Sequence, residues 1–301
     1  MGEHRDITAL TRWDWGGVAA ERYLQLAADA RFPSAARALA RNMLAAARDD
    51  EALDGIFKDA GRYMAAMLGI YLHVSGGLTL PRLKALCVAS GFLSPGRARD
   101  LLQLQQHLGF VAMLSPAGGG RPAGYAPTAI LMAAWRAHLA AALEAARIVE
   151  PAVGLVLDRL DRPEVFETFT RLHSEGLMRS APDADHASAY VRVIMHRHAG
   201  NQIVWALLTD GTEEENFPPR ASLPISIAGA ARRFAVSRIH IERMLDEAER
   251  EGLMRWDRNG GVVLEDAARS YLRLSYAGQL VQLLIAAAGT LRERPELAGR
   301  A

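Results

Sequence analysis

The sequence predicts a mainly helical protein in which one unit of short helices and a β-hairpin occurs twice, with long helices joining the two copies. Three observations lead to this fold class. Ala, Leu and Arg dominate the 301 residues and aromatic residues make up only 7%, a composition that favours helices over sheet. Apolar residues recur at helical spacing through most of the chain. Two stretches interrupt that spacing in the same order, and glycines and prolines mark their turns.

The first half is expected to begin with helices over 18–31, 34–48 and 54–74, the last of which ends at the Gly76-Gly77 pair. Short elements follow. In chain order they are an extended piece at 78–80, a helix at 81–89, a turn at 90–94, a helix at 94–108, a strand at 110–114, a glycine-rich tip at 116–122 and a strand at 125–127. A long helix over 128–149 closes this half. Its apolar stripe consists of Leu131, Trp135, Leu139, Ala142 and Ala146.

The second half repeats this order. Helices are expected over 151–160 and 163–175, the second ended by Gly176, and a long helix over 185–208 precedes an acidic loop. The short elements are then a strand at 223–225, a helix at 226–234, a turn at 235–237, a helix at 237–251, a strand at 253–256, a hairpin tip at 259–261 and a strand at 262–265. A long helix over 266–288 closes this half.

The two halves match at a constant offset of 143 residues. Ser94 matches Ser237 as a helix cap, the pair Leu101-Leu102 matches Met244-Leu245, and Gly109 matches Gly252. The residues between these landmarks differ. We therefore interpret the chain as an internal duplication, with one domain over 1–150 and a second over 151–301.

The order of short helix, turn, capped helix, two-stranded hairpin and long helix is that of a winged helix-turn-helix. The stretch SIAGAARRFAVSRIHIERMLDEAEREGLM at 226–254 resembles the helix-turn-helix and first wing strand of MarR-like and related bacterial winged-helix regulators. The shared pattern runs from Leu245 to Gly252-Leu253, and in the first copy from Leu102 to Gly109-Phe110. The resemblance covers 78–127 and 223–265. It implies two winged units in a pseudo-twofold arrangement, flanked by helices like the dimerisation helices of that family.

Such a unit binds DNA because a helix about 10–12 Å across fits a major groove about 12 Å wide. In the first copy the candidate DNA contacts are Arg82 and Lys84 before the turn, Ser94, Arg97, Arg99 and Gln103 on the second helix, and Arg121 at the wing tip. In the second copy they are Arg232 and Arg233, then Ser237, Arg238, His240, Ile241 and Arg243, and Arg258 and Asn259 in the wing.

The two copies differ in charge. Residues 79–124 hold five basic residues against one acid, whereas 226–261 hold seven against six. The first copy is thus expected to be the stronger electrostatic anchor. Because the candidate contacts differ, the preferred duplex is expected to be asymmetric rather than palindromic. Either one chain acts as a monomeric pseudo-dimer, or two chains form a homodimer.

Sequence-specific binding of double-stranded DNA, in transcriptional regulation, is therefore the expected function. The alternatives are a winged-helix protein–protein adaptor and a plasmid-type replication initiator. No nucleophile and base stand at a catalytic spacing, and the glycines at 118–120 lack the Lys and helix of a phosphate loop. We therefore expect neither an enzyme nor a cofactor. A small-molecule effector pocket lined by Trp135, Met195 and Trp205 is a further alternative.

The lone cysteine, Cys87, excludes a disulfide framework and a multi-Cys zinc site, and is expected in the core rather than as a redox sensor. His196 and His198 are two residues apart and cannot share a metal from one helix, so no metal site is expected. The net charge is +1, so any DNA site is a local patch. Without a leader pattern or an apolar run of about 18 residues, we expect a cytoplasmic, nucleoid-associated protein that has no contact with a membrane.

Overall fold

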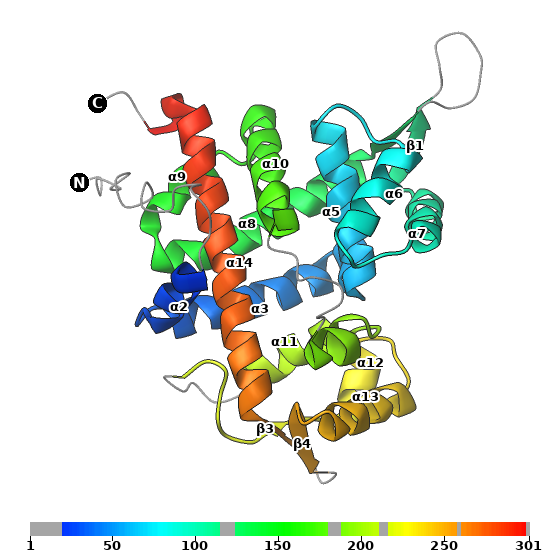
Figure 1. Cartoon of the computed structure of the whole chain (residues 1–301), viewed down its shortest axis with the longest axis vertical. Helices are drawn as coiled ribbons and strands as arrows, with labels where there is room; N and C mark the ends of the chain where they lie inside the picture. Colours follow the sequence, from blue (N-terminus) through cyan, green and yellow to red (C-terminus); the bar gives the residue numbers. More distant parts are fainter. Residues whose placement is uncertain (1–19, 115–123, 180–187, 211–215, 258–259, 299–301) are drawn as a thin grey trace.

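The computed structural model describes residues 20–114, 124–179, 188–210, 216–257 and 260–298. It confirms the fold class in its coarse form. The chain is mainly helical and carries two small antiparallel sheets, of two and three strands. Figure 1 shows both sheets toward the outside of the molecule, while the long helices fill the middle.

Four helices open the described chain. They are α2 (Ala20–Ala28), α3 (Phe32–Asp49), α4 (Glu51–Phe57) and α5 (Ala60–Val74). The single helix expected over 54–74 is wrong, because two carboxylates start two separate helices. The side chain of Asp50 accepts from Leu53 N and that of Asp59 accepts from Arg62 N, each from an extended backbone. The helix expected over 18–31 ends earlier, because the Asp29 carboxylate accepts from Arg31 N.

The first set of short elements agrees with the expectation. It comprises α6 (Leu80–Ala89), α7 (Pro95–His107), β1 (Val111–Leu114) and β2 (Gly124–Pro127), and is followed by α8 (Ala129–Val149). We call residues 78–127 the first unit. All five residues of the apolar stripe predicted on α8 are buried.

The segment between the two sets departs most from the prediction. It contains η1 (Pro151–Val153), α9 (Gly154–Leu157), α10 (Pro163–Arg179), a π-helical turn η3 (Val191–Met195) and α11 (Gly200–Asp210). The continuous helix expected over 185–208 is wrong. Its break includes Ala199, which has a φ of 59° and donates its N–H to the carbonyl of Lys58 at 2.6 Å. Likewise α10 does not stop at Gly176 but runs on to Arg179.

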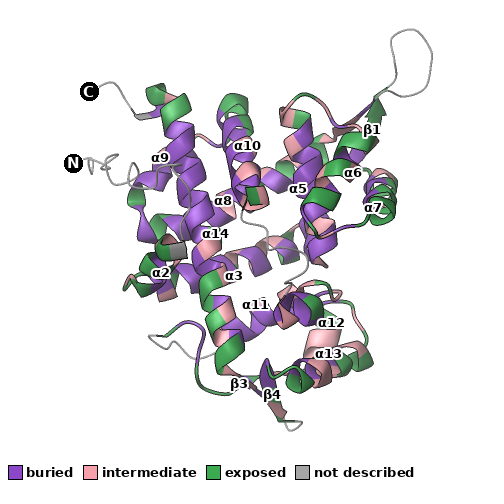
Figure 2. Ribbon diagram, viewed as in Figure 1, coloured by how far each residue is buried: buried purple, intermediate pink, exposed green. Residues whose placement is uncertain are grey.

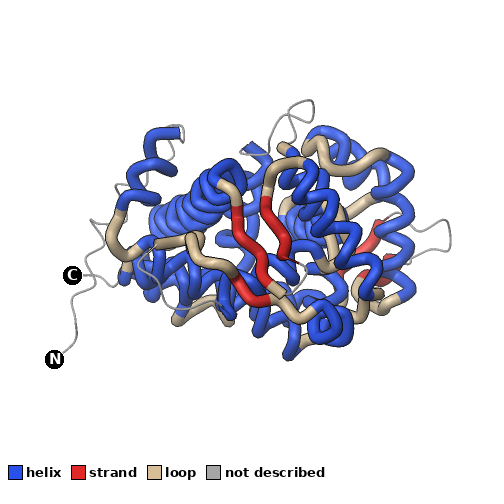
Figure 3. Tube along the Cα trace, turned by 90° about the horizontal axis from the view of Figure 1, so that it is seen from below, coloured by secondary structure: helices blue, strands red, loops and turns tan. Residues whose placement is uncertain are grey.

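The second set has the same order as the first. It contains β3 (Leu223–Pro224), α12 (Ile227–Arg233), α13 (Arg238–Arg250), β4 (Met254–Asp257) and β5 (Gly261–Leu264). We call residues 223–265 the second unit. Its strand order is β3-β5-β4, with Leu223 opposite Val262, and Figure 3 shows these strands side by side. In the first unit Leu78 bridges Tyr125 of β2 in the same way.

The closing helix α14 (Asp266–Glu293) runs the length of the molecule (Figure 1). It packs against α2, α3 and α10, and against α8, the long helix that follows the first unit. Gln282 Nε2 donates to the Tyr23 hydroxyl at 3.1 Å, and this hydrogen bond connects α14 to α2. Figure 2 shows α14 buried over most of its length.

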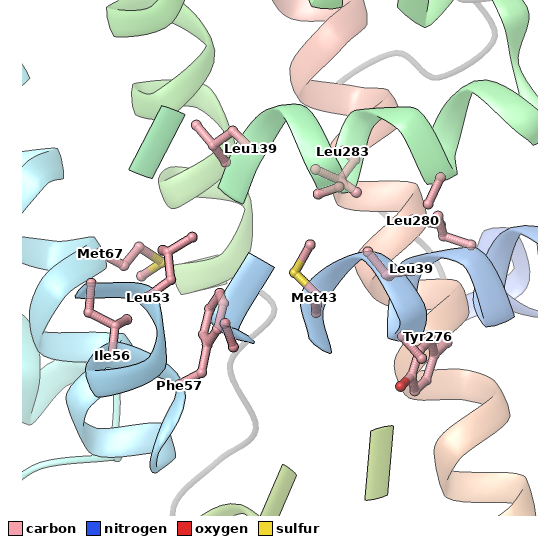
Figure 4. Close-up of a cluster of buried hydrophobic side chains, with 14 of the residues drawn as sticks. Leu39, Met43, Leu53, Ile56, Phe57, Met67, Leu139, Tyr276, Leu280 and Leu283 are labelled. Carbon is pink, nitrogen blue, oxygen red and sulfur yellow. The ribbon is translucent and has the colours of Figure 1, made fainter. Parts of the chain in front are cut away.

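One hydrophobic core extends through both halves of the chain. In Figure 4, Leu280 and Leu283 of α14 lie near Leu39 and Met43 of α3. By length and composition alone, α8 and α14 are apolar enough to cross a membrane, but 50% and 78% of their apolar windows are buried inside the protein. Burial in the core therefore accounts for the apolar character of α14.

Candidate nucleic-acid interface

The helices α7 and α13 bury matching positions at the offset of 143 residues. In α7 the buried residues are Ala98, Leu101, Leu102 and Gln105; in α13 they are Ile241, Met244, Leu245 and Ala248. Each helix therefore turns the same face to its own unit and the same face outward. Ile241 belongs to the core, so the expectation that it contacts a base is wrong.

Both helices begin with the same serine cap. Ser94 Oγ accepts from Arg97 N at 3.2 Å, and Ser237 Oγ accepts from His240 N at 3.1 Å. Each helix N-terminus also carries the positive end of the helix dipole. The first turns therefore begin at matched, exposed positions.

Both helices also end in the same way. Gly109 and Gly252 adopt φ values of +73° and +67°, which glycine accepts without steric cost. In the first unit Phe110 N donates back to Gln105 O at 2.8 Å, and in the second Leu253 N donates to Ala248 O at 2.9 Å. This geometry is a Schellman-type end, and it sends each chain directly into a hairpin strand.

Four of the predicted contacts of the first unit are exposed on α7 or at its cap: Ser94, Arg97, Arg99 and Gln103. Arg99 lies 3.6 Å from the carboxylate of Asp100. That pair is more than half exposed, so it contributes little and leaves the guanidinium accessible. The structure thus leaves four polar side chains exposed at and after the N-terminus of α7.

The two basic residues before the turn are placed differently. Arg82 donates to the carbonyls of Ser75, Gly76 and Gly77, at 3.3, 3.0 and 2.6 Å. Its guanidinium therefore caps the C-terminal end of α5, whereas the sequence predicted a DNA contact. Lys84 is half-buried on α6.

In the second unit Arg238 and Arg243 are exposed on α13, as are Arg232 and Arg233 at the end of α12. Arg233 lies over the ring of Phe234, 5.4 Å from its centroid. His240 turns inward instead, because its Nε2 hydrogen-bonds to the carbonyl of His198 at 2.9 Å. His240 therefore attaches α13 to the chain before α11.

Three acids at the end of α13 and at its C-cap have partners in the structure. Glu251 pairs with Arg192 at 3.1 Å, and Glu247 pairs with Arg197. Glu249 accepts from Trp256 N at 3.2 Å. The first two acids stand one helical turn apart and meet the segment around η3, so their charges do not lie at the exposed first turn. Spacing within α13 carries no signal for these pairs. Ile239, which is 58% exposed on the first turn, is a further candidate contact beyond those predicted from the sequence.

Arg121, Arg258 and Asn259, the predicted wing contacts, lie outside the described residues.

The remaining candidates have structural surroundings. Cys87 is fully buried, and desolvation raises the pKa of its thiol to about 12. His196 is exposed and lies 6.0 Å from the ring of Phe92, centroid to centroid. Within the described ranges, no three His, Cys, Asp or Glu side chains form a group that could hold a metal ion.

The proposed effector residues do not line the open pocket between α10 and α14. A cavity of about 320 Å³ lies between α10 and α14, where Glu175, Arg179 and Arg292 line it. Trp135 is instead packed in the core against Tyr63 and His138, with ring centroids at 5.5 and 4.8 Å. Trp205 packs against Phe57 at 5.4 Å.

No protein-family model, no curated protein and no solved structure matches this chain.

Proposed function

We propose that this chain is a sequence-specific double-stranded-DNA-binding protein, a cytoplasmic transcriptional regulator. In this proposal both units are winged helix-turn-helix domains related by a pseudo-twofold axis, and α7 and α13 are their recognition helices. The proposal depends on one observation. The first turn of each helix is exposed and capped by a serine, and the two serines match through the offset of 143 residues. Exposed arginines follow each cap, at positions that differ between the two helices.

The physical basis is the attraction between these helix ends and a polyanion. A helix N-terminus presents free N–H groups and a partial positive charge, which favour phosphate. Arg97 and Arg99 on α7, and Arg238 and Arg243 on α13, add full positive charges beside it. Arginine both neutralises phosphate and forms bidentate bonds to guanine in the major groove. Each unit therefore has the groups for anchoring and for base recognition.

The pairing of the acids supports the proposal that the exposed side of α13 binds DNA. Glu247 and Glu251 pair with Arg197 and Arg192 on the side of α13 that contacts the η3 segment. Their charges therefore do not oppose a phosphate at the outer side as strongly as a formal count of charges implies. This accounts for a recognition helix with several acids in its C-terminal half.

One observation favours the second candidate, a protein–protein adaptor. Met113 and Leu114 on β1 and Ile130 at the start of α8 are exposed by 56%, 51% and 60%. Protein–DNA interfaces are polar and positively charged, so these three side chains suit a protein partner better than a duplex.

Binding to duplexes chosen from a random-sequence pool distinguishes the two functions. For a DNA-binding protein with about six phosphate contacts, affinity for the selected duplex falls by about 10³-fold or more between 50 and 200 mM salt. An adaptor enriches no sequence and shows no salt-dependent binding. Arg48→Ala is the control, because Arg48 lies on α3 and pairs with its neighbour Asp49. This variant is expected to bind like the wild type.

A further inference from the structure

Lys58 occupies an unusual position for a charged residue. It is one of only two lysines among 35 basic residues, and its side chain is buried. Its ammonium lies 2.9 Å from Asp54 Oδ1, 3.2 Å from the carbonyl of Phe234 and 3.5 Å from Gln202 Oε1. These acceptors belong to α4, to the end of α12 and to α11. A compact ammonium satisfies three acceptors around one point, which the planar fork of an arginine does not.

The acceptor on Phe234 connects Lys58 to the second unit. Phe234 ends α12 and opens the turn that leads to α13. The main chain of Lys58 makes a second connection, because its carbonyl accepts from Ala199 N. His198, the preceding residue, accepts from His240 of α13. Lys58 thus contacts the second unit directly at its turn and indirectly at its capped helix.

Gly61, three residues after Lys58, lies against the first unit. A Cβ on Gly61 would lie 2.9 Å from Leu93 Cδ2 and 3.9 Å from Leu101 Cδ1. Leu93 lies in the turn between α6 and α7, and Leu101 is a core residue of α7. Residues 58–61 therefore contact the turn of each unit, on one side through a buried charge and on the other through close packing.

The ion pairs between α13 and the η3 segment are weaker connections. The side chains of Arg192 and Glu251 are 56% and 41% exposed, and exposed pairs contribute little to stability because water screens them. Removing the buried ammonium of Lys58 takes this donor from the carbonyl of Phe234, whereas Asp54 is 40% exposed and keeps the hydrogen bond from Gln202 Nε2 at 2.8 Å. Lys58 is therefore a buried polar connection to the turn of the second unit, beside the contacts of β3 with α11 and of α13 with η3.

We propose that Lys58 is a positioning residue that fixes the second unit relative to the first, so that the protein recognises a duplex with two unlike half-sites at one fixed spacing. This inference rests on the proposed function. Two rigidly held binding modules gain affinity from each other only when the geometry lets both engage. A second unit that moves freely tolerates several spacings.

The test measures affinity for the selected duplex and for versions with about five base pairs, half a helical turn, added between the half-sites. Wild type is expected to lose about 100-fold on the altered spacing. Lys58→Met is expected to lose about tenfold or less, because its second unit reorients. Arg48→Met removes a positive charge from an exposed site and is expected to keep the wild-type preference. A Lys58→Met protein with the wild-type spacing preference overturns the inference.

A DNA-free measurement separates this inference from the proposed function. Hydrogen exchange at the amides of α12 and α13 is expected to accelerate at least tenfold in Lys58→Met, while exchange in α3 and α8 stays unchanged. If no duplex binds wild type, the proposed function fails and this measurement still tests Lys58. If Lys58→Met does not fold, Lys58→Arg takes its place, because it keeps the charge and loses the three-acceptor geometry. Unchanged exchange in the folded variant overturns the role of Lys58.

Discussion

A Cβ placed on Gly176 would lie 2.3 Å from Oε1 of Gln282. Gly176 is buried in the last turn of α10, and Gln282 is buried on α14. The glycine therefore lets two core helices approach each other, and it leaves room for the hydrogen bond from Gln282 to Tyr23.

Gly176→Ala is expected to lower the free energy of unfolding by about 1–3 kcal/mol, because overpacking displaces Gln282. Gly278→Ala is the matched control. Gly278 lies one turn before Gln282 on α14, and a Cβ there meets Tyr23 at an ordinary 3.8 Å. The control is expected to be neutral or stabilised by up to about 1 kcal/mol. Urea unfolding measures both, and equal stability of the two variants contradicts the close approach.

Two buried histidines make stability depend on pH. Burial lowers the pKa of His173 to about 4 and, with the nearby His173, that of His138 to about 3. The unfolded chain binds protons near pH 6.5, whereas the native state stays neutral, so stability is complete above about pH 6.5 and falls as the pH decreases. Each histidine is expected to contribute a slope of about 1.4 kcal/mol per pH unit between pH 6 and 5.

His173→Gln removes one of these groups and is expected to reduce the slope by about half. Urea unfolding at pH 7, 6 and 5 measures the dependence of the free energy of unfolding on pH. His196 is exposed, so His196→Gln is the control that keeps the wild-type slope. A wild-type stability that does not change over this range shows that the two histidines are not buried in the neutral form.

Cys87 is expected to resist thiol reagents in the native protein. Burial raises its pKa to about 12, so almost no thiolate is present at neutral pH. Reaction with a disulfide reagent is expected only after unfolding in urea. Rapid reaction of the native protein at pH 8, with a change in DNA affinity, supports the redox-sensor alternative instead.

Ile239 is expected to contact a thymine methyl group. Its side chain is 58% exposed on the first turn of α13, beside Arg238, and apolar side chains recognise the C5-methyl of thymine. Ile239→Ala is expected to weaken binding to the selected duplex about fourfold, as for one buried methyl group. Replacing the contacted thymine by uracil removes the same contact. The affinity of the variant is therefore expected to be equal for the two duplexes. An equal loss for wild type and variant contradicts the assignment.

The sequence predicts the units well because their signals are local. Ser94 and Ser237 cap the helices that follow them, and Gly109 and Gly252 end those helices in the positive-φ conformation. Caps, closing glycines and buried stripes depend on neighbours within a few residues. The matched positions of α7 and α13 could therefore be predicted before any tertiary contact was known.

The errors arise where distant residues decide the local structure. Ala199 breaks the helix expected over 185–208, and its N–H bonds to Lys58, 141 positions earlier in the chain. In the sequence, Gly176 resembles the glycine that ends a helix. In the structure, a glycine is needed there because Gln282 leaves no space for a Cβ. His240 faces inward because of the carbonyl of His198. Spacing within one segment carries no signal for such contacts.

The central claim is that one chain carries two DNA-binding helices, and a hydroxyl-radical footprint on the selected duplex tests it most directly. One bound chain is expected to protect two separate segments of unlike sequence, about one helical turn apart. Arg97→Ala with Arg99→Ala is expected to remove one segment, and Arg238→Ala with Arg243→Ala the other. Protection that neither pair of substitutions changes, or no protection at all, contradicts the account.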